Sequence, residues 1–327
     1  MISWKPSSFH AYSIPAFQLF YRNLKPIPMK TTRSHAVIAA LWMSGTLVSF
    51  MLMAIGGRQL SGQLTTFQIL FFRSMIGLLI VTFLLWRSGW RQIYTRLFRI
   101  HALRNIAHFG GQFGWFYGIA YIPLAEVFAL EFTVPVWTAV LATVLLGEQI
   151  TRARLTAIVF GVLGVILILR PGLAVINPAS LAVLGGALGY ALSHTLTRRL
   201  ALVDTPLTIL FYMTLIQLPL GFVTSIFDWT TPSAAMLPWI IVVGVTALSG
   251  HYCMARALAL ADAIVVVPMD FLRLPLIAFI GALFYGEPLD WLVLAGGSVM
   301  FTGNLVNIQA EGKRSKELKA AAARLEN

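Results

Sequence analysis

Charged residues are scarce in this sequence. They make up 11% of the 327 residues, whereas apolar residues make up 58% and the mean hydropathy is +0.80. A soluble domain carries about 25% charged residues, so this chain has too few polar side chains to coat a water-soluble globule. The solvent that suits it is lipid, in which a spanning helix needs roughly 20 apolar residues and must bond its own backbone.

Cysteine is almost absent as well. The single Cys253 excludes an internal disulfide, and its apolar surroundings favour simple packing. No Walker motif occurs, so we expect no direct use of ATP, and we predict no cofactor and no metal site. A signal-peptide pattern is missing from the first 28 residues. We expect residues 1–33 to be a disordered N-terminal extension, of which residues 1–28 are either part of the native protein or an artefact of the choice of start site.

Apolar runs alternate with short polar or Pro/Gly breaks along the rest of the chain. This alternation predicts an all-α membrane protein with ten transmembrane helices. The expected spans lie near residues 36–55, 66–86, 104–121, 124–146, 153–170, 179–200, 206–227, 236–258, 262–285 and 290–309.

The net charge of +12 fits either a nucleic-acid surface or the loops on one side of a membrane. If the N-terminus is cytoplasmic, all but four of the 24 Lys and Arg residues lie in cytoplasmic segments. The four exceptions are Arg58 and Arg170, which fall in loops on the outer side, and Arg73 and Arg273, which lie within spans. This bias follows the positive-inside rule, so we predict no nucleic-acid partner, two cytoplasmic termini and a cytoplasmic tail over 310–327, as a short helix or loose chain.

The two halves of the chain resemble each other. The segment "TTFQILFFRSMIGLL" at 65–79 parallels "TPLTILFYMTLIQLP" at 205–219. Further along, identical residues recur at an offset of 139, namely Gly111 and Gly250, Phe132 and Phe271, and Gly164 and Gly303. Each half holds five spans, so the second copy enters the membrane from the opposite side. Inverted repeats of this kind suit alternating access with a site near the midplane.

A known family shares these features. The segment 116–172, with "LGE" at 146–148, is similar to the EamA family of the drug/metabolite transporter superfamily, and the segment 255–291, with "YGE" at 285–287, resembles the same pattern. The resemblance covers roughly residues 34–309. It implies two five-helix repeats, 34–172 and 173–309, around a cavity lined mainly by spans 1, 3, 4, 6, 8 and 9. It also implies a permease or exporter of a small metabolite in the bacterial inner membrane, and no enzyme.

Two carboxylates within the spans are the first candidates for a site. Glu131 and Asp270 are repeat mates at mirrored depths, and Pro135 and Pro275 weaken the helices around them. A charge at the centre of a spanning helix costs about 2.5–3.5 kcal/mol, so we expect these acids to bind substrate or a coupling proton. The alternative is a fixed salt bridge, because Arg273 follows Asp270 by three residues on one helix face.

Further candidates are less sharply defined. Arg73 is either a ligand of the substrate or a structural anchor for Glu131 or Glu126, and Glu126 itself is expected near the outer mouth. Aromatic side chains could stack on a flat substrate, although most aromatic residues in spans simply pack. The candidates for such stacking are Trp42, Trp115, Tyr117, Tyr190 and His251.

The leading hypothesis is a secondary transporter of a small molecule, driven by an ion gradient or by exchange. An intramembrane enzyme is one alternative, since two acids on different spans resemble an aspartic dyad, although the "GxGD" context of such proteases is absent. A non-transporting receptor or channel is another. The expected partners are the small-molecule substrate and the lipid bilayer, and the oligomeric state is left open, a homodimer included.

Overall fold

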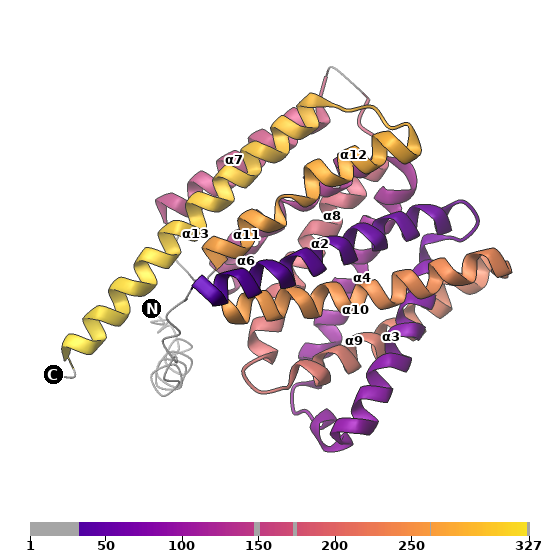
Figure 1. Ribbon diagram of the computed structural model, residues 1–327, viewed down its shortest axis with the longest axis horizontal. Coiled ribbons are helices and arrows are strands. Elements are labelled where there is room, and N and C mark those ends of the chain that lie inside the picture. The colour runs from indigo at the N-terminus through magenta and orange to yellow at the C-terminus, as the bar shows by residue number, and fades with distance from the viewer. Residues whose placement is uncertain (1–32, 147–150, 173–174, 262, 326–327) are drawn as a thin grey trace, which may run out of the picture.

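The computed structural model describes residues 33–146, 151–172, 175–261 and 263–325, and all its regular elements are helices (Figure 1). Residues 1–32 of the predicted extension and the Gly147–Glu148 pair lie outside this part of the chain. The α-helices are α2 (Arg33–Ser61), α3 (Thr66–Ser88), α4 (Phe98–Tyr121), α5 (Leu124–Glu131), α6 (Val134–Leu146), α7 (Arg152–Leu169), α8 (Pro178–Leu200), α9 (Pro206–Ser225), α10 (Leu237–Leu260), α11 (Ala263–Asp270), α12 (Arg273–Tyr285) and α13 (Trp291–Leu325). Short 3-10 turns are η1 (Trp90–Ile93), η2 (Ile226–Asp228) and η3 (Ala234–Met236).

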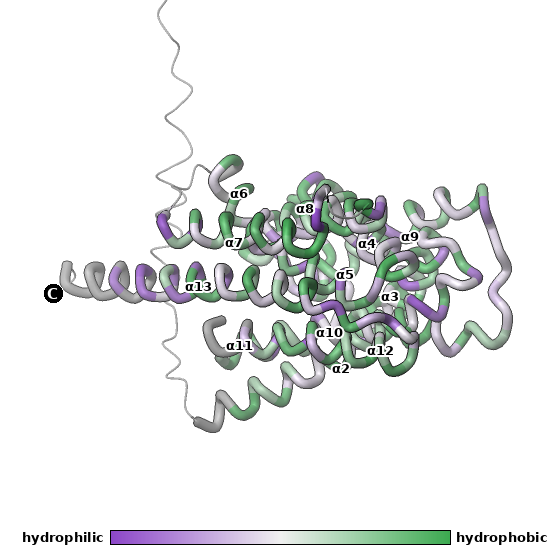
Figure 2. Tube along the Cα trace, turned by 90° about the horizontal axis from the view of Figure 1, so that it is seen from above, coloured by the Kyte–Doolittle hydropathy of each residue, from purple (hydrophilic) through white to green (hydrophobic). Residues whose placement is uncertain are grey.

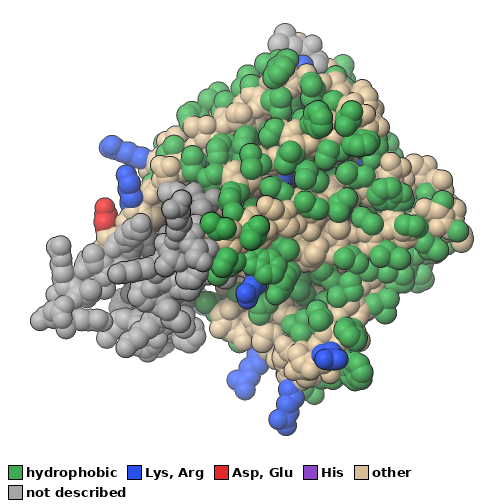
Figure 3. Space-filling model, in the orientation of Figure 1, with side chains coloured by type: hydrophobic (Ala, Val, Ile, Leu, Met, Phe, Trp, Pro, Cys, Tyr) green, Lys and Arg blue, Asp and Glu red, His purple; other side chains and the backbone are tan. Residues whose placement is uncertain are grey.

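The outer surface is apolar. Nine stretches of the described residues are long and apolar enough to cross a membrane. Large side chains such as Leu41, Leu79 and Phe279 are more than 60% exposed. Figure 3 shows a face covered mainly by hydrophobic side chains, with Lys and Arg along its left and lower edges. Such a surface needs lipid as its solvent, so the chain is an integral membrane protein.

Helix α4, the expected third span, is not among these nine stretches. It is 24 residues long, but one of its faces is polar. The buried polar residues on it are His101, Arg104, Asn105, His108 and Gln112. Their spacing of three or four residues places them on one side of the helix, where α4 packs against α8 and α9. The polar face therefore points into the protein, and ten spanning helices remain a prediction.

Equivalent threonines begin two of the helices. Thr65 caps α3 by accepting a hydrogen bond from the backbone N–H of Gln68 at 3.3 Å, and Thr205 caps α9 by accepting one from Thr208 at 3.2 Å. Each cap satisfies a backbone donor that has no partner within the helix. The identity of Thr65 and Thr205 in the two halves thus has a local structural reason.

The helices pack in pairs, α2 on α10, α4 on α8, α3 on α9, α7 on α13 and α5 on α12. The α2–α10 and α7–α13 pairs lie side by side in Figure 1. Small residues allow the closest approach, because a Cβ built on Gly114 would overlap the backbone oxygen of Ala182. Gly118 also meets α8, but Gly110 has nothing within 4 Å and Gly111 makes the contact instead. Gly111, Gly114 and Gly118 thus bring α4 close to its neighbouring helix α8.

Two expected spans are interrupted. The run 124–146 forms α5 and α6, and the run 262–285 forms α11 and α12, with a turn between each pair. Each turn lies two to four residues before a proline, Pro135 or Pro275. Proline has no N–H to donate to the carbonyl four residues earlier, and its ring clashes with it. The two acids of interest, Glu131 and Asp270, are therefore the last residues of short helices.

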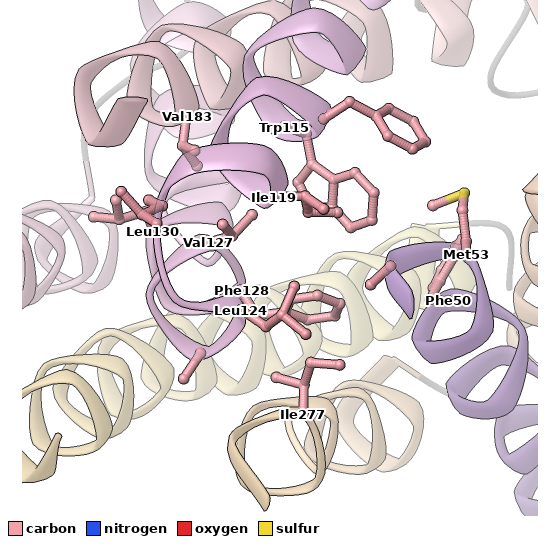
Figure 4. Close-up of a cluster of buried hydrophobic side chains, with 14 of the residues drawn as sticks. Phe50, Met53, Trp115, Ile119, Leu124, Val127, Phe128, Leu130, Val183 and Ile277 are labelled. Carbon is pink, nitrogen blue, oxygen red and sulfur yellow. The ribbon is translucent and has the colours of Figure 1, made fainter. Parts of the chain in front are cut away.

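The hydrophobic core lies around α5. Figure 4 shows Phe50, Trp115, Leu124, Phe128 and Ile277 converging from α2, α4, α5 and α12. At the other extreme, α13 has 35 residues, about 52 Å at 1.5 Å per residue, and exceeds the bilayer core of about 30 Å. Its hydrophilic positions gather toward the C-terminal end (Figure 2). The tail from 310 to 325 continues this helix and is not a separate or loose segment.

Candidate functional site

A cavity of about 490 Å³ lies among the helices. It is bordered by α2 to α8 and by α10 to α13, so both halves of the chain contribute. The lining residues are Phe50, Met53, Arg73, His108, Gln112, Trp115, Phe116, Glu131, Phe132, Val134, Pro135, Thr138, Ala139, Arg154, Tyr190, His194, Arg198, His251, Met254, Leu258, Asp270, Arg273, Phe301, Asn304, Asn307, Ile308 and Glu311.

Three charged residues in this lining form the Arg273 cluster, which consists of Glu131, Asp270 and Arg273. The guanidinium of Arg273 donates to Asp270 Oδ2 at 2.6 Å and lies 3.6 Å from Glu131 Oε1. The side chain of Arg273 is 8% exposed. Bonds between a guanidinium and carboxylates are among the stronger hydrogen bonds in proteins, so this cluster ties the end of α5 to α11 and α12.

The surroundings of the Arg273 cluster are aromatic. The guanidinium carbon lies 5.2 Å from the ring centre of Phe50, 5.7 Å from that of Phe128 and 5.8 Å from that of Phe132. The indole N–H of Trp115 donates to Glu131 Oε2 at 2.9 Å. These contacts keep the charges in a water-poor place, where an attraction between charges is stronger than in water.

The basic pole of the cavity consists of Arg73, His108, Tyr190, His194 and His251. Its rings are close neighbours, with centroids 5.3 Å apart for His108 and Tyr190, and 6.4 Å apart for both His108–His251 and Tyr190–His194. Within the described residues, Arg73 has no hydrogen bond or ion pair, and its buried Nε is unsatisfied. The basic pole therefore contains a guanidinium with no counter-charge.

An amide network holds His108. Gln112 Nε2 and Gln217 Nε2 lie 2.9 and 3.0 Å from His108 Nδ1. Both amide groups belong to buried side chains, and each has a buried oxygen without a partner among the described residues. Since buried polar groups normally find partners, this region is suited to water or a polar ligand.

Hydrogen bonds join several helix ends at one end of the molecule. There the Glu287 closure, formed by Arg58, Ile122, Leu124 and Glu287, joins α2, α12 and the start of α5. Arg58 donates to Ile122 O and to Glu287 Oε1, both at 2.7 Å, and the backbone N–H of Leu124 donates to Glu287 Oε2 at 2.8 Å. None of these four residues lines the cavity.

Toward the opposite end the cavity extends along polar residues. Arg154 in the first turn of α7, Arg198 in the last turn of α8 and Glu311 of α13 all line it. Arg154 pairs with Glu311 at 2.9 Å. This is the end at which α2 begins and α13 leaves the helical body, so the cavity reaches toward the side of the chain termini.

Seven of the ten site residues expected from the sequence line this cavity, and they include all three members of the Arg273 cluster and Arg73. Glu126 does not line it, and its carboxylate accepts a 2.6 Å hydrogen bond from Ser180. Trp42 packs edge-on against Tyr252, and Tyr117 lies against Phe113 and Tyr121. The expected ion pair of Arg73 with Glu131 or Glu126 does not occur, because Arg273 holds Glu131.

Sequence reasoning missed several lining residues. Gln112, Asn304 and Asn307 are polar positions within apolar runs, and that contrast was the available signal. His108 and His194 looked isolated because 86 residues separate them in the chain. The packing of α4 on α8 brings them to one cavity.

Comparisons with known proteins agree with this architecture. The model of the EamA-like transporter family matches residues 37–170 and 177–309. The S-adenosylmethionine uptake transporter of Rickettsia prowazekii is 24% identical over 83% of this chain and 92% of that protein. The riboflavin transporter of Vibrio cholerae is 28% identical over 87% of this chain and 97% of that protein. The pseudopaline exporter of Pseudomonas aeruginosa is 29% identical over 73% of this chain and 85% of that protein.

One crystal structure has the same fold, with a TM-score of 0.58 and 16% identity over 88% of this chain and 99% of that chain. The family model covers most of this chain in two consecutive matches, and the three relatives are all named as transporters. The alternative of an intramembrane enzyme is therefore dropped. The chain belongs to the EamA-like transporter family and is an integral membrane transporter.

Proposed function

We propose that this chain is a secondary transporter that moves a small metabolite across the bacterial inner membrane by alternating access. The observation that carries the proposal is a cavity of about 490 Å³ inside an apolar helical body, lined by aromatic side chains and by charged ones such as Arg73 and Arg273. Its volume lies in the range of about 300–1,000 Å³ that is typical of small-molecule sites. The relatives named for S-adenosylmethionine, riboflavin and pseudopaline support a small metabolite as the cargo.

The two moving parts are the halves predicted from the sequence, related as inverted repeats. Equivalent contacts support this relation. A Cβ built on Gly111 would lie 2.8 Å from the ring of Tyr190, and one built on Gly250 would lie 2.7 Å from the ring of Phe50. Gly111 and Gly250 are repeat mates, and Tyr190 follows Phe50 by 140 residues. One close approach is thus repeated in the other half.

The pairing of helices supports the same relation. Exchanging the two halves converts the α2–α10 pair into the α8–α4 pair, and the α3–α9 and α7–α13 pairs each join equivalent helices. Two copies of one bundle inserted in opposite directions produce such a pattern, and a binding site then forms near the midplane where they meet. The cavity lies between the halves as this arrangement requires.

The bias of the basic loops supports cytoplasmic termini. In that topology the Glu287 closure lies on the outer side, and the polar mouth near Arg154 and Arg198 lies on the inner side. The conformation described here is then inward-facing. Alternating access requires a second conformation in which the Glu287 closure opens and the inner mouth closes.

The Arg273 cluster is the proposed coupling element. One guanidinium and two ionised carboxylates leave one net negative charge, which a single proton or a cationic group of the substrate neutralises. We assign this role to Glu131 and Asp270, with Trp115, Tyr190 and His251 as stacking surfaces. Glu126, bonded to Ser180 away from the cavity, is assigned to the outer mouth only. Association into a homodimer stays a prediction.

Transport by purified protein in vesicles tests the proposal. A thermal-shift screen against amino acids, vitamins and nucleosides first finds a ligand, because binding to the native state raises the melting temperature. Vesicles are then loaded with that ligand, with and without a pH gradient. We expect Glu131→Gln and Asp270→Asn to abolish the effect of the gradient, whereas Asp228→Asn, which changes an exposed acid, leaves it intact.

Two results would reject parts of this account. Full activity with an unchanged pH dependence in both acid variants would reject coupling through Glu131 and Asp270. If no ligand of the screen crossed the vesicle membrane, a non-transporting receptor would replace the transporter.

A further inference from the structure

We infer that the cargo is a planar ring compound with a single anionic group, carboxylate or phosphate, and that Arg73 binds this group. The inference rests on the proposed function and adds the class of substrate to it. It starts from the one feature of the cavity that the coupling proposal leaves unused, the unpaired guanidinium of the basic pole.

Arg73 is 5% exposed and lines the cavity from α3. Within the described part of the chain it has neither a hydrogen bond nor an ion pair, and its Nε is buried without a partner. Removing a cation from water without a counter-charge is costly, and charged groups inside membrane proteins usually pair or bind a ligand. Arg73 therefore needs an anion that the described residues do not supply.

The carboxylates of the cavity are already engaged. Glu131 and Asp270 bind Arg273, and Glu311 binds Arg154. No other Asp or Glu lines the cavity in the described residues. The described residues thus leave Arg73 without a counter-charge, and a guanidinium offers a planar fork of donors that matches a carboxylate or a phosphate.

Nearby cations strengthen the attraction for an anion. Arg104 is buried, and its described hydrogen bonds go to neutral groups, Thr197 Oγ1 at 3.1 Å and Asn105 Oδ1 at 2.6 Å. Both Arg73 and Arg104 act electrostatically on His108. Arg198 lines the cavity on the way to its polar mouth. With Arg154 and Arg198 against Glu311, this end of the cavity carries a net positive charge, which attracts anions.

The walls between the two charged regions are aromatic. Phe50, Trp115, Tyr190 and Phe301 all line the cavity, and flat side chains favour flat ligands through offset or edge-to-face contacts. The Arg273 cluster at the other side has more carboxylates than guanidinium groups, so it repels a second anion. A ring with one anionic group at the end near Arg73 fits both regions.

Matched ligand pairs test the inference on the purified full chain. The probes are benzoate against benzamide and phenyl phosphate against phenol, with inorganic phosphate alone to reveal binding of any anion. We expect at least one anionic ring compound to bind about tenfold more tightly than its neutral partner. One charge-assisted hydrogen bond is enough to produce a difference in affinity of this size. A preference for benzoate over benzamide indicates a carboxylate as the anionic group, and a preference for phenyl phosphate over phenol indicates a phosphate.

Two arginine variants separate binding from folding. Arg73→Gln is expected to reduce the anion-to-neutral ratio to about one, whereas Arg73→Lys, which keeps the charge, retains part of it. Arg199→Gln, an exposed arginine in the same basic turn as Arg198, should leave the ratio unchanged. A purely structural Arg73 would weaken both members of a pair equally, so an unchanged ratio in Arg73→Gln overturns the inference. Equal affinity of wild type for both members, or binding of neither, also overturns it.

Uptake into vesicles distinguishes this failure from failure of the proposed function. Movement of neutral rings but not anionic ones by wild type would overturn the inference and leave the transporter proposal standing. Binding of an anionic ring without any movement would contradict the transporter proposal and support the assignment of Arg73.

Discussion

The rings of Phe132 and Phe271 lie with their centroids 5.2 Å apart and their planes at 40°. Each follows the last residue of a short helix, Glu131 of α5 or Asp270 of α11, and the sequence repeat equates the two phenylalanines. The two helix breaks therefore meet inside the protein, next to Arg273. A movement of either half relative to the other must change this contact, which is why the break region suits a transport site.

Replacing Arg273 with Gln should destabilise the protein. Glu131 and Asp270 would lose their common guanidinium, and removing one partner of a buried ion pair costs on the order of 3–5 kcal/mol. The measurement is the free energy of unfolding in detergent. Adding Asp270→Asn to Arg273→Gln should recover part of the loss, because residues of one network do not act additively. An additive double variant would contradict the shared cluster.

Replacing Glu287 with Gln should loosen the Glu287 closure. Hydrogen bonds to charged groups contribute about 1.5–3 kcal/mol each, and Glu287 accepts two, from Arg58 and Leu124. Opening of the closure is measured with a cysteine in place of Met53 in a Cys253→Ala background. Met53 lies on α2, five residues before Arg58, and lines the cavity. Labelling of this cysteine by an impermeant maleimide from outside should become about tenfold faster.

A control variant accompanies that experiment. Asp228→Asn removes an exposed carboxylate that takes no part in the closure and should leave the labelling rate unchanged. Equal rates in the Glu287→Gln and parent proteins would show that this closure does not restrict access to the cavity.

The ion pair between Arg170 and Asp290 predicts a pH effect on stability. Partial burial opposes ionisation of Asp290, but hydrogen bonds from Arg170 and from the Leu292 N–H hold its pKa below the ordinary 3.8. A lowered folded-state pKa stabilises the protein fully above the unfolded-state pKa, and this contribution is lost as the pH falls through the folded-state value. The side chains are 29% and 33% exposed, so the contribution is about 1 kcal/mol or less.

Thermal melting of wild type and Asp290→Asn between pH 7 and pH 3 measures this contribution. Wild type should melt higher at neutral pH, and the difference should shrink toward the acid end of the range. A difference that stays constant across the range would mean that Asp290 stabilises the fold by some means other than its charge.

Two neighbouring glycines of α4 should respond differently to the same substitution. A Cβ on Gly114 would overlap the backbone of Ala182, whereas a Cβ on Gly110 meets nothing within 4 Å. Gly114→Ala should therefore destabilise the protein by about 1–3 kcal/mol, as overpacking does, or prevent folding. Gly110→Ala should be neutral or slightly stabilising. Equal melting temperatures for the two variants would contradict the close α4–α8 contact.

The sequence could predict the spanning helices and the buried charges, because both depend on local composition. Apolar runs located nine stretches of the described residues that are long enough for a bilayer, and charges within such runs stood out as Glu131, Asp270 and Arg273. The weakening of two helices by Pro135 and Pro275 was also foreseeable, since proline acts on a residue four positions away.

Side-chain partners could not be predicted in the same way, because they depend on how distant helices pack. Glu126 was expected at the outer mouth, but its partner Ser180 lies 54 residues away in sequence. For Arg73 the sequence left open a substrate ligand or an anchor for an acid, and among the described residues it has no acidic partner. The α4–α8 contact decides where His108 and His194 lie, and the sequence of one helix does not reveal its neighbour.

The central claim is that two halves of like structure lie in opposite orientations in the membrane. The test uses single cysteines in place of Trp90 or Thr230 in a Cys253→Ala background. Both positions are exposed and lie in corresponding loops of the two halves. Intact cells are treated with an impermeant maleimide. The account predicts that the cysteine at 230 is labelled from outside and the one at 90 only after the membrane is opened. Labelling of both from the same side would contradict it.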